Sequence, residues 1–260
     1  MGKRNANPIK SPEQIAMARV AARLAADVLT MIAPHVKPGV STEQLDRLCH
    51  DYIVDVQRAI PANVGYGGFP KTVCVSPNHV VCHGIPAPDA ILRDGDILNL
   101  DVGVLKDGWF GDTSRMYLVG QPAKQATRLV DTTYAAMWAG IRAVRPGATL
   151  GDVGHAIQSL AEGAGYSVVL DYCGHGIGMI YHDAPQVCHY GRPGQGMVLK
   201  PGMLFTIEPM INAGKAATRQ LDDGWTVETR DRSLSAQWEH MVLVTETGFE
   251  VLTLAPGEQA

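Results

Sequence analysis

The sequence predicts an α+β fold in which one plan of helices and strands occurs twice. In each half, a long helix with apolar residues at helical spacing ends at a Pro-Gly turn, a second helix follows, and short strands rich in Val and Ile come next. The turns are Val36-Lys37-Pro38-Gly39-Val40-Ser41 and, 108 residues later, Val144-Arg145-Pro146-Gly147-Ala148-Thr149. Pro-Gly pairs end many helices, so chance is the alternative. The matching flanks and order favour two halves related by a pseudo-twofold axis.

Composition describes an ordinary globular chain of 260 residues, 46% hydrophobic and 18% charged. The net charge of −4 and the absence of a Lys/Arg block argue against nucleic acid or an anionic membrane as the main partner. No apolar run approaches the roughly 20 residues that span a bilayer. The polar start, Met1 to Asn5, lacks a signal-peptide pattern. Five widely spaced cysteines suit reduced thiols, so we expect a cytoplasmic protein.

The expected elements follow local signals along the chain. Residues 1–10 are expected to be a flexible tail, and 11–256 a single domain with halves at about 11–120 and 123–254. Ser11-Pro12-Glu13 is a helix start, and Ser41-Thr42-Glu43 opens the second helix. Further helices are expected at 123–144 and 150–165, and strands at 72–76, 80–83, 97–105, 116–119, 167–171, 203–209 and 238–245.

A predicted hairpin in the first half carries two acids. The dipeptide Asp107-Gly108 favours a two-residue turn, which places Asp101 opposite Ser114 and Asp112 opposite Gly103. Both carboxylates then project from one face, with Cβ atoms roughly 7 Å apart. Two such acids repel each other unless a positive charge lies between them. The alternative is a solvated face with two surface acids, and a three-residue loop would require a bulge to keep both acids on one face.

Three polar residues of the second half extend this pattern. His175 lies among glycines, and Glu208 and Glu239 lie in or beside apolar strands, where an ionised carboxylate is costly to bury unless it is paired or bound to metal. Each has a structural explanation when taken alone. With Asp101 and Asp112 they make four carboxylates and one imidazole, which suit two divalent ions such as Mn, Fe(II), Co or catalytic Zn. Such a pair activates water for hydrolysis of an amide or a phosphate ester, and the lack of a phosphate loop favours the amide.

The ordered motifs resemble those of the bacterial type 1 methionine aminopeptidases. The resemblance runs from about Ser11 to Leu254 and implies the creatinase or pita-bread fold, an antiparallel sheet covered by helices. It also implies a metal-dependent hydrolase that removes the initiator methionine when the second residue is small. The motifs are Val81-Cys82-His83-Gly84-Ile85-Pro86, Asp94-Gly95-Asp96, Gly111-Asp112-Thr113-Ser114, Gly174-His175-Gly176-Ile177-Gly178, Phe205-Thr206-Ile207-Glu208-Pro209 and Ser235-Ala236-Gln237-Trp238-Glu239-His240.

The resemblance implies a role for each matching residue. The metal ligands are Asp101, Asp112, His175, Glu208 and Glu239. His83 and His182 contact the substrate, His182 stabilises the oxyanion, and Glu208 also shuttles a proton. The methionine pocket falls on Tyr66, Phe69, Cys74, Tyr181 and Trp225. A monovalent-cation site found in some members falls on Asn78, Val80 and Ser235.

Some positions depart from the family pattern. Phe69 and Tyr181 stand where a Tyr and a Phe are common, and Asn63, Gly67 and Met179-Ile180 also differ. These departures put the shape of the pocket in question and leave the reaction class unchanged.

The resemblance implies nascent polypeptide N-termini as substrates, the ribosome near the exit tunnel as a partner, and a monomer. Two alternatives stay open. An Xaa-Pro peptidase shares the fold and metals but normally carries an extra N-terminal domain, for which this chain has no room. A metal-free creatinase-fold binding module is disfavoured because all five ligand types are present. The separation of Glu208 and Glu239 by 31 positions favours type 1 over type 2 enzymes.

Overall fold

The computed structural model describes residues 9–258 of the chain. The expected tail therefore lies outside the described residues, apart from its last two positions. Ile9 forms a β-bridge with Met203, and the Lys10 amide donates to the Gly202 carbonyl at 2.7 Å. Within the described part, no helix combines the length and the apolar character that crossing a membrane requires.

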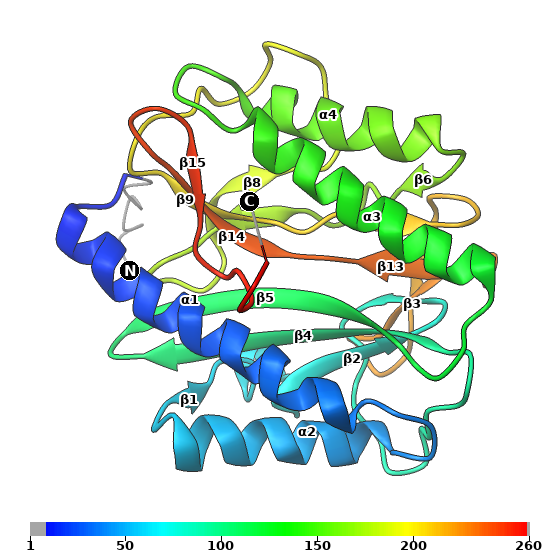
Figure 1. The fold of residues 1–260 in the computed structure, drawn as a ribbon. Coiled ribbons are helices and arrows are strands. Elements are labelled where there is room, and N and C mark those ends of the chain that lie inside the picture. The colour runs from blue at the N-terminus through cyan, green and yellow to red at the C-terminus, as the bar shows by residue number, and fades with distance from the viewer. Residues whose placement is uncertain (1–8, 259–260) are drawn as a thin grey trace.

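Within residues 9–258, four α-helices are arranged in two pairs (Figure 1). They are α1 (Pro12–Ile32), α2 (Thr42–Asp51), α3 (Lys124–Ala143) and α4 (Leu150–Gly163). A 3-10 turn, Ala33–His35, extends α1, a π-helical turn, Tyr52–Val56, extends α2, and a short 3-10 turn spans Tyr66–Gly68. One core cluster joins α1 and α2 to β2 and β4, and a second joins α3 and α4 mainly to strands of the second half. A third cluster packs α1 against Ile177, Leu204 and Met241 of the second half.

The strands form four small antiparallel sheets. In the first half they are β1 (Ile60–Pro61), β2 (Val73–Pro77), β3 (Val80–Cys82), β4 (Ile97–Lys106) and β5 (Trp109–Leu118). In the second half they are β6 (Ser167–Val168), β7 (Gly174–Gly176), β8 (Asp183–Val187), β9 (Leu204–Ile207), β10 (Met210–Asn212), β11 (Thr218–Gln220), β12 (Val227–Thr229), β13 (Ser235–Gln237), β14 (His240–Val244) and β15 (Phe249–Val251). The sheet orders are β1-β4-β2 with β5 on β4, β13-β10-β6, β11-β12-β3 and β15-β14-β9-β7-β8.

The two Pro-Gly turns have the same local structure. Gly39 and Gly147 both have positive φ, and their amides donate to Leu92 and Leu199 at 2.8 and 3.0 Å. The next helix in each half begins with a capping box, on Ser41 in one case and on Thr149 in the other. The repeat is thus a repeat of hydrogen bonds as well as of sequence.

The β4–β5 hairpin has the predicted register. Asp107 and Gly108 both have positive φ, as a type I′ turn requires, and Lys106 pairs with Trp109. Asp101 therefore lies opposite Ser114, and Asp112 lies opposite Gly103. No bulge interrupts the ladder between them, so the three-residue loop is excluded.

Helix α1 packs very closely on β5. The facing residues of the helix are small, among them Ala18, Ala21, Ala22 and Ala25, all fully buried. A Cβ atom on Gly111 would lie 2.1 Å from the Ala21 carbonyl oxygen, so only glycine fits there. This contact fixes β5 beneath α1 directly beside Asp112.

The strand predictions were incomplete. The strand predicted from apolar runs at 116–119 is the end of β5, which begins at Trp109 as the hairpin prediction requires. The predicted strands at 203–209 and 238–245 correspond to β9 and β14, which are shorter, because β9 ends before Glu208-Pro209 and β14 begins after Trp238-Glu239. Eight strands were not predicted, because all are short and several contain Gly, Pro, Gln or charged residues that lack an apolar pattern: β1, β7, β8, β10, β11, β12, β13 and β15.

A mostly buried carboxylate, that of Glu258, connects the C-terminal segment to the second half. The Glu258 carboxylate accepts hydrogen bonds from the Tyr134 hydroxyl at 2.8 Å and the Ala255 amide at 2.9 Å, and it lies 3.3 Å from His240 Nε2. Burial opposes ionisation, but His240 and the other donors outweigh it and lower the pKa of Glu258 from 4.5 to about 2.

We expect Glu258→Gln to lower the free energy of unfolding at pH 7 by about 1–2 kcal/mol, after allowance for solvent screening. A depressed carboxyl pKa stabilises the fold fully above the unfolded pKa of 4.5, and this contribution is lost as the pH falls toward 2. The difference in urea midpoint between variant and wild type should therefore be constant above about pH 5 and shrink below it. Glu250→Gln, which removes an exposed ion pair with Arg19, is the matched control. A difference independent of pH would contradict the assignment.

Candidate metal centre and substrate pocket

Five predicted ligands converge from five separate strands or strand ends. Asp101 lies on β4, Asp112 on β5 and His175 on β7, Glu208 directly follows β9, and Glu239 directly precedes β14. Ligand atoms lie within 4.8 Å of one another in the groups Asp112–His175–His182, His175–Glu208–Glu239 and Asp101–Asp112–Glu239. The structure therefore brings together residues that are up to 138 positions apart in the sequence.

His175 links the two groups of carboxylates. Its Nε2 atom lies 3.5 Å from Asp112 Oδ2 and 3.6 Å from Glu208 Oε1. Its Nδ1 atom lies 3.1 Å from the Gly176 carbonyl, which can only accept a hydrogen bond. The proton of the neutral ring is therefore assigned to Nδ1, which leaves the Nε2 lone pair directed at the carboxylates, as in metal-ligating histidines.

The electrostatics of the cluster are unfavourable for anions. Burial, followed by the neighbouring carboxylates, raises the pKa values of Asp101 and Glu239 well above their usual range. Burial also raises the pKa of Glu208 to about 7, against the charge of His175. For His175, burial lowers the pKa, but the hydrogen bond and charge of Asp112 and the charge of Glu208 reverse this and raise it. Each shift favours fewer negative charges in the cluster.

The donor set fits divalent cations. Glu239 is 2% exposed, and its Oε1 atom is buried with no hydrogen-bond donor. Such an orphaned carboxylate oxygen is costly unless a cation binds it. Oxygen ligands with one imidazole match the divalent ions predicted from the sequence.

A pocket of about 180 Å³ opens onto the cluster. All five predicted pocket residues line it, together with both predicted substrate-contacting histidines and Asn63. His83 packs edge-on against Trp225, with ring centroids 6.0 Å apart, and Phe69 packs against the same indole at 5.2 Å. His182 lies at the rim, its ring centroid 4.1 Å from His175 and 4.9 Å from Tyr66. The pocket is thus apolar at the Trp225 end and polar at the carboxylate end.

Asn63 and Tyr181, two departures from the family pattern, are hydrogen-bonded to each other. The Tyr181 hydroxyl donates to Asn63 Oδ1 at 2.6 Å and lies 3.3 Å from Asp112 Oδ1. A Cβ atom on Gly103 would lie 1.9 Å from that hydroxyl, so Gly103 provides the space for it. A buried phenol requires a partner, and the sequence departure at position 63 supplies one.

The three residues expected at a monovalent-cation site lie near one another. The Ser235 amide donates to the Asn78 carbonyl at 2.8 Å, and Val80 begins β3 two residues further on. The Asn78 side chain is already engaged, since its Oδ1 accepts from the Ile97 amide and its Nδ2 donates to Asp96.

Sequence reasoning missed the polar residues that hold the ligands. Thr206 donates to Glu208 Oε1 at 2.7 Å and accepts from the His175 amide at 2.9 Å, and Gln237 Nε2 lies 3.4 Å from Glu208 Oε2. A signal was available, because residues two apart in a strand share a face. Each carboxylate ligand has a polar neighbour at that spacing: Asn99 for Asp101, Ser114 for Asp112, Thr206 for Glu208 and Gln237 for Glu239.

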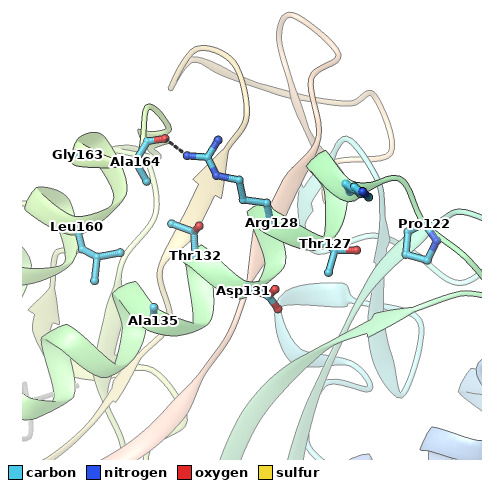
Figure 2. Close-up of a pocket in the computed structure, with 10 residues that line it drawn as sticks. Pro122, Thr127, Arg128, Asp131, Thr132, Ala135, Leu160, Gly163 and Ala164 are labelled. Atoms are coloured by element: carbon cyan, nitrogen blue, oxygen red, sulfur yellow. Dashed lines mark hydrogen bonds between the residues drawn. The ribbon is translucent and has the colours of Figure 1, made fainter.

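A larger hollow, of about 620 Å³, lies between α3 and α4 (Figure 2). Arg128 extends along it and donates to the Ala164 carbonyl at 3.1 Å, at the C-terminal end of α4. Its lining residues lie between Pro122 and Ala135 and between Leu160 and Ala164, and they present no converging carboxylates or histidines. Despite its size, this hollow lacks the groups that a hydrolytic site requires.

The chain belongs to metallopeptidase family M24, because the model of that family matches residues 16–246. Membership of this family makes the protein a hydrolase that depends on divalent metal. The Escherichia coli (strain K12) protein named methionine aminopeptidase is 57% identical over 246 residues, which cover 95% of this chain and 93% of that one.

Solved structures confirm the fold prediction. The crystal structure of methionine aminopeptidase from Rickettsia prowazekii superposes with a TM-score of 0.93 at 56% identity and covers 95% of this chain and 99% of that chain. A prolidase from Pyrococcus furiosus has a TM-score of 0.77 at 21% identity, and the match covers 95% of this chain and 66% of that one. The second likeness shows a shared fold alone.

We expect divalent metal to stabilise the protein strongly. A chelator should lower the thermal midpoint by about 5–10 °C relative to protein with Mn²⁺ at roughly 100 times its dissociation constant, because metal binds the folded state alone. Glu239→Gln should raise the midpoint of the chelated protein, since it removes one buried charge, and should reduce the gain from Mn²⁺. Differential scanning calorimetry measures both effects.

Glu250→Gln is the control for the calorimetry, because it removes an exposed carboxylate. It should leave the gain from Mn²⁺ unchanged. Equal gains in the wild type and in Glu239→Gln would contradict a role for Glu239 in metal binding.

Proposed function

We propose that this enzyme removes the N-terminal methionine from polypeptides whose second residue is small. The observation that carries the proposal is the pocket, where an apolar end lined by Phe69, Cys74 and Trp225 adjoins the buried carboxylates. An unbranched methionine side chain suits such an apolar pocket. The identity with curated methionine aminopeptidases over most of the chain supports the same activity.

The five ligands would hold two divalent ions. When bound, these ions supply an activated water and polarise the scissile carbonyl. The first group, Asp101–Asp112–Glu239, and the second, His175–Glu208–Glu239, share Glu239, and Asp112 also contacts His175. Asp112 and Glu239 therefore lie close to both groups of ligands and would help to hold both ions.

The remaining side chains bind the substrate and move protons. His83 and Trp225 form one wall of the pocket, so the substrate N-terminus enters beside His83. Glu208 is held by Thr206 and Gln237 through its two oxygens, which orients it to carry a proton to the leaving amine. Tyr66 and His182 border the opening, where the second residue of the substrate would lie.

His182 is suited to donate a neutral hydrogen bond. Burial of its ring, followed by the charge of His175, lowers the pKa of His182 to about 4. At neutral pH the ring is uncharged and keeps one N–H donor. We propose that this donor stabilises the negative charge that develops on the scissile carbonyl oxygen.

His182→Ala should lower kcat by about 10²–10³-fold with a small change in KM, as expected for the loss of one donor to an oxyanion. The assay is release of methionine from Met-Gly-Met in the presence of Mn²⁺, with circular dichroism to establish that the variant is folded. His155→Ala, on the exposed face of α4, is the control and should keep full activity. If the His182 variant kept kcat while KM rose, the residue would bind the ground state only.

A cleavage assay with two substrates distinguishes the proposed enzyme from an Xaa-Pro peptidase. An Xaa-Pro peptidase would cleave Ala-Pro and leave Met-Gly-Met intact, whereas the proposed enzyme would do the reverse. A metal-free binding module would cleave neither substrate at any metal concentration.

We further propose a cytoplasmic monomer that acts on nascent chains at the ribosome and holds a monovalent cation at Asn78, Val80 and Ser235. These parts of the proposal rest on the resemblance. Cosedimentation with ribosomes, sedimentation velocity, and the dependence of stability on K⁺ against a bulky organic cation would test them separately.

A further inference from the structure

Two cysteines lie opposite each other at the open end of the β7–β8 hairpin. The register pairs Gly174 with Val187 and His175 with Gln186, so one step outward places Cys173 opposite Cys188. Directly opposed residues of an antiparallel pair have Cα atoms roughly 4.5 or 5.5 Å apart, depending on the position in the ladder. Disulfides accept Cα separations of roughly 4.4–6.8 Å. Either separation falls within the range that a disulfide accepts.

The two cysteines also differ from the others in exposure. Cys173 and Cys188 are only partly buried free thiols, whereas the other three cysteines are buried. A thiol must be accessible to react with an oxidant in solution, so these two are the cysteines open to oxidation.

Small molecules can reach one of the two thiols. Cys188 lines a surface cavity of about 320 Å³ together with Tyr190 and Arg192. Arg192 lines the same cavity, and its cation is suited to the carboxylates of an acidic thiol peptide. Cys173 lies across the ladder from Cys188, in position to attack a sulfur atom bonded to it.

We propose that Cys173 and Cys188 are a redox modification site that forms a reversible disulfide with a small disulfide oxidant. The Cys188 thiolate attacks oxidised glutathione, which gives a mixed disulfide and releases one glutathione thiolate. The Cys173 thiolate then attacks the Cys188 sulfur, closes the protein disulfide and releases the second glutathione. Two protein thiols are oxidised, one glutathione disulfide is reduced to two thiols, and the two thiol protons pass to the glutathione thiolates.

The bond would close the segment from Cys173 to Cys188. That segment contains His175, Tyr181 and His182. A cross-link restricts the unfolded chain more than the folded hairpin, so oxidation should raise the thermal midpoint. The proposal requires neither of these histidines to change its contacts, and it stands independently of the proposed aminopeptidase activity.

The test is oxidation of the full chain as purified. Protein is incubated with oxidised glutathione, remaining thiols are blocked with N-ethylmaleimide, and proteolytic peptides are analysed by mass spectrometry. We expect a loss of two hydrogens, three blocked thiols of the five, and one cross-linked peptide pair that joins Cys173 to Cys188. Dithiothreitol should reverse all three changes, and the oxidised protein should unfold several degrees higher.

Single substitutions make the outcome decisive. Cys173→Ser should stop at a mixed disulfide on Cys188, and Cys188→Ser should form no cross-link, whereas Cys49→Ser should still form one. Five blocked thiols in the wild type, a glutathione adduct that persists on Cys188, or a cross-link between other cysteines would each overturn the proposal. Because the readout is a mass, failure here leaves the proposed activity untouched.

Discussion

Mutual repulsion of buried carboxylates is the constraint on which this structure depends. Asp101, Asp112, Glu208 and Glu239 share a site with one imidazole, and burial and neighbouring carboxylates oppose the ionisation of Asp101, Glu208 and Glu239. A fold can hold such a cluster only if a cation compensates it or if protons neutralise it. We therefore expect divalent metal to contribute to the stability of the protein as well as to its chemistry, and rigid strands to hold the ligands in place.

The frame that resists this repulsion joins the two halves directly. The Thr113 hydroxyl donates to the Glu239 carbonyl at 2.7 Å, and the Glu239 amide donates to the Ser114 carbonyl at 3.2 Å. Asn99 Nδ2 donates to both Ser114 Oγ and the Gln237 carbonyl. These bonds fasten β4 and β5 to the β13–β14 segment beside the ligands, so the site lies at the seam between the halves.

Local signals made the first half of the site predictable. One dipeptide, Asp107-Gly108, determined the register of β4 and β5 and so the shared face of Asp101 and Asp112. In the second half, the setting of His175, Glu208 and Glu239 among glycines and apolar residues made them candidates, and the family resemblance implied their roles as ligands. No local pattern requires His175 and Glu208 to meet. Strands β7 and β8 carry so few apolar residues that alternation could not reveal them.

The hydrogen bonds inside the pocket could not be predicted from the sequence, and the reason is physical. The bond between Tyr181 and Asn63 joins positions 118 apart and depends on the missing side chain of Gly103. In the sequence, Asn63 and Tyr181 are two separate departures from the family pattern and Gly103 is one glycine among many. Only the packed structure shows that Asn63 bonds the Tyr181 hydroxyl and that Gly103 leaves space for it. The roles of Thr206 and Gln237 could have been predicted, because each lies two residues before a ligand, at the spacing that puts residues of a strand on the same face.

The duplicated plan explains why the ligands come in matched pairs. Asp101 and Glu208 are 107 residues apart, as are Leu92 and Leu199, which accept equivalent hydrogen bonds from the two Pro-Gly turns. Asp112 lies on β5, which pairs with β4, the strand of Asp101, and Glu239 directly precedes β14, which pairs with β9, the strand that directly precedes Glu208. The halves differ in the length of their strands. In the first half β4 and β5 run without a break, whereas in the second half Glu208-Pro209 separates β9 from β10 and Trp238-Glu239 separates β13 from β14. Pro209 lacks the amide that a ladder requires, so the first break frees Glu208 to turn toward the site. At the second break, the Glu239 amide leaves the β9 ladder and donates to the Ser114 carbonyl of β5, which brings Glu239 to the hairpin of the first half.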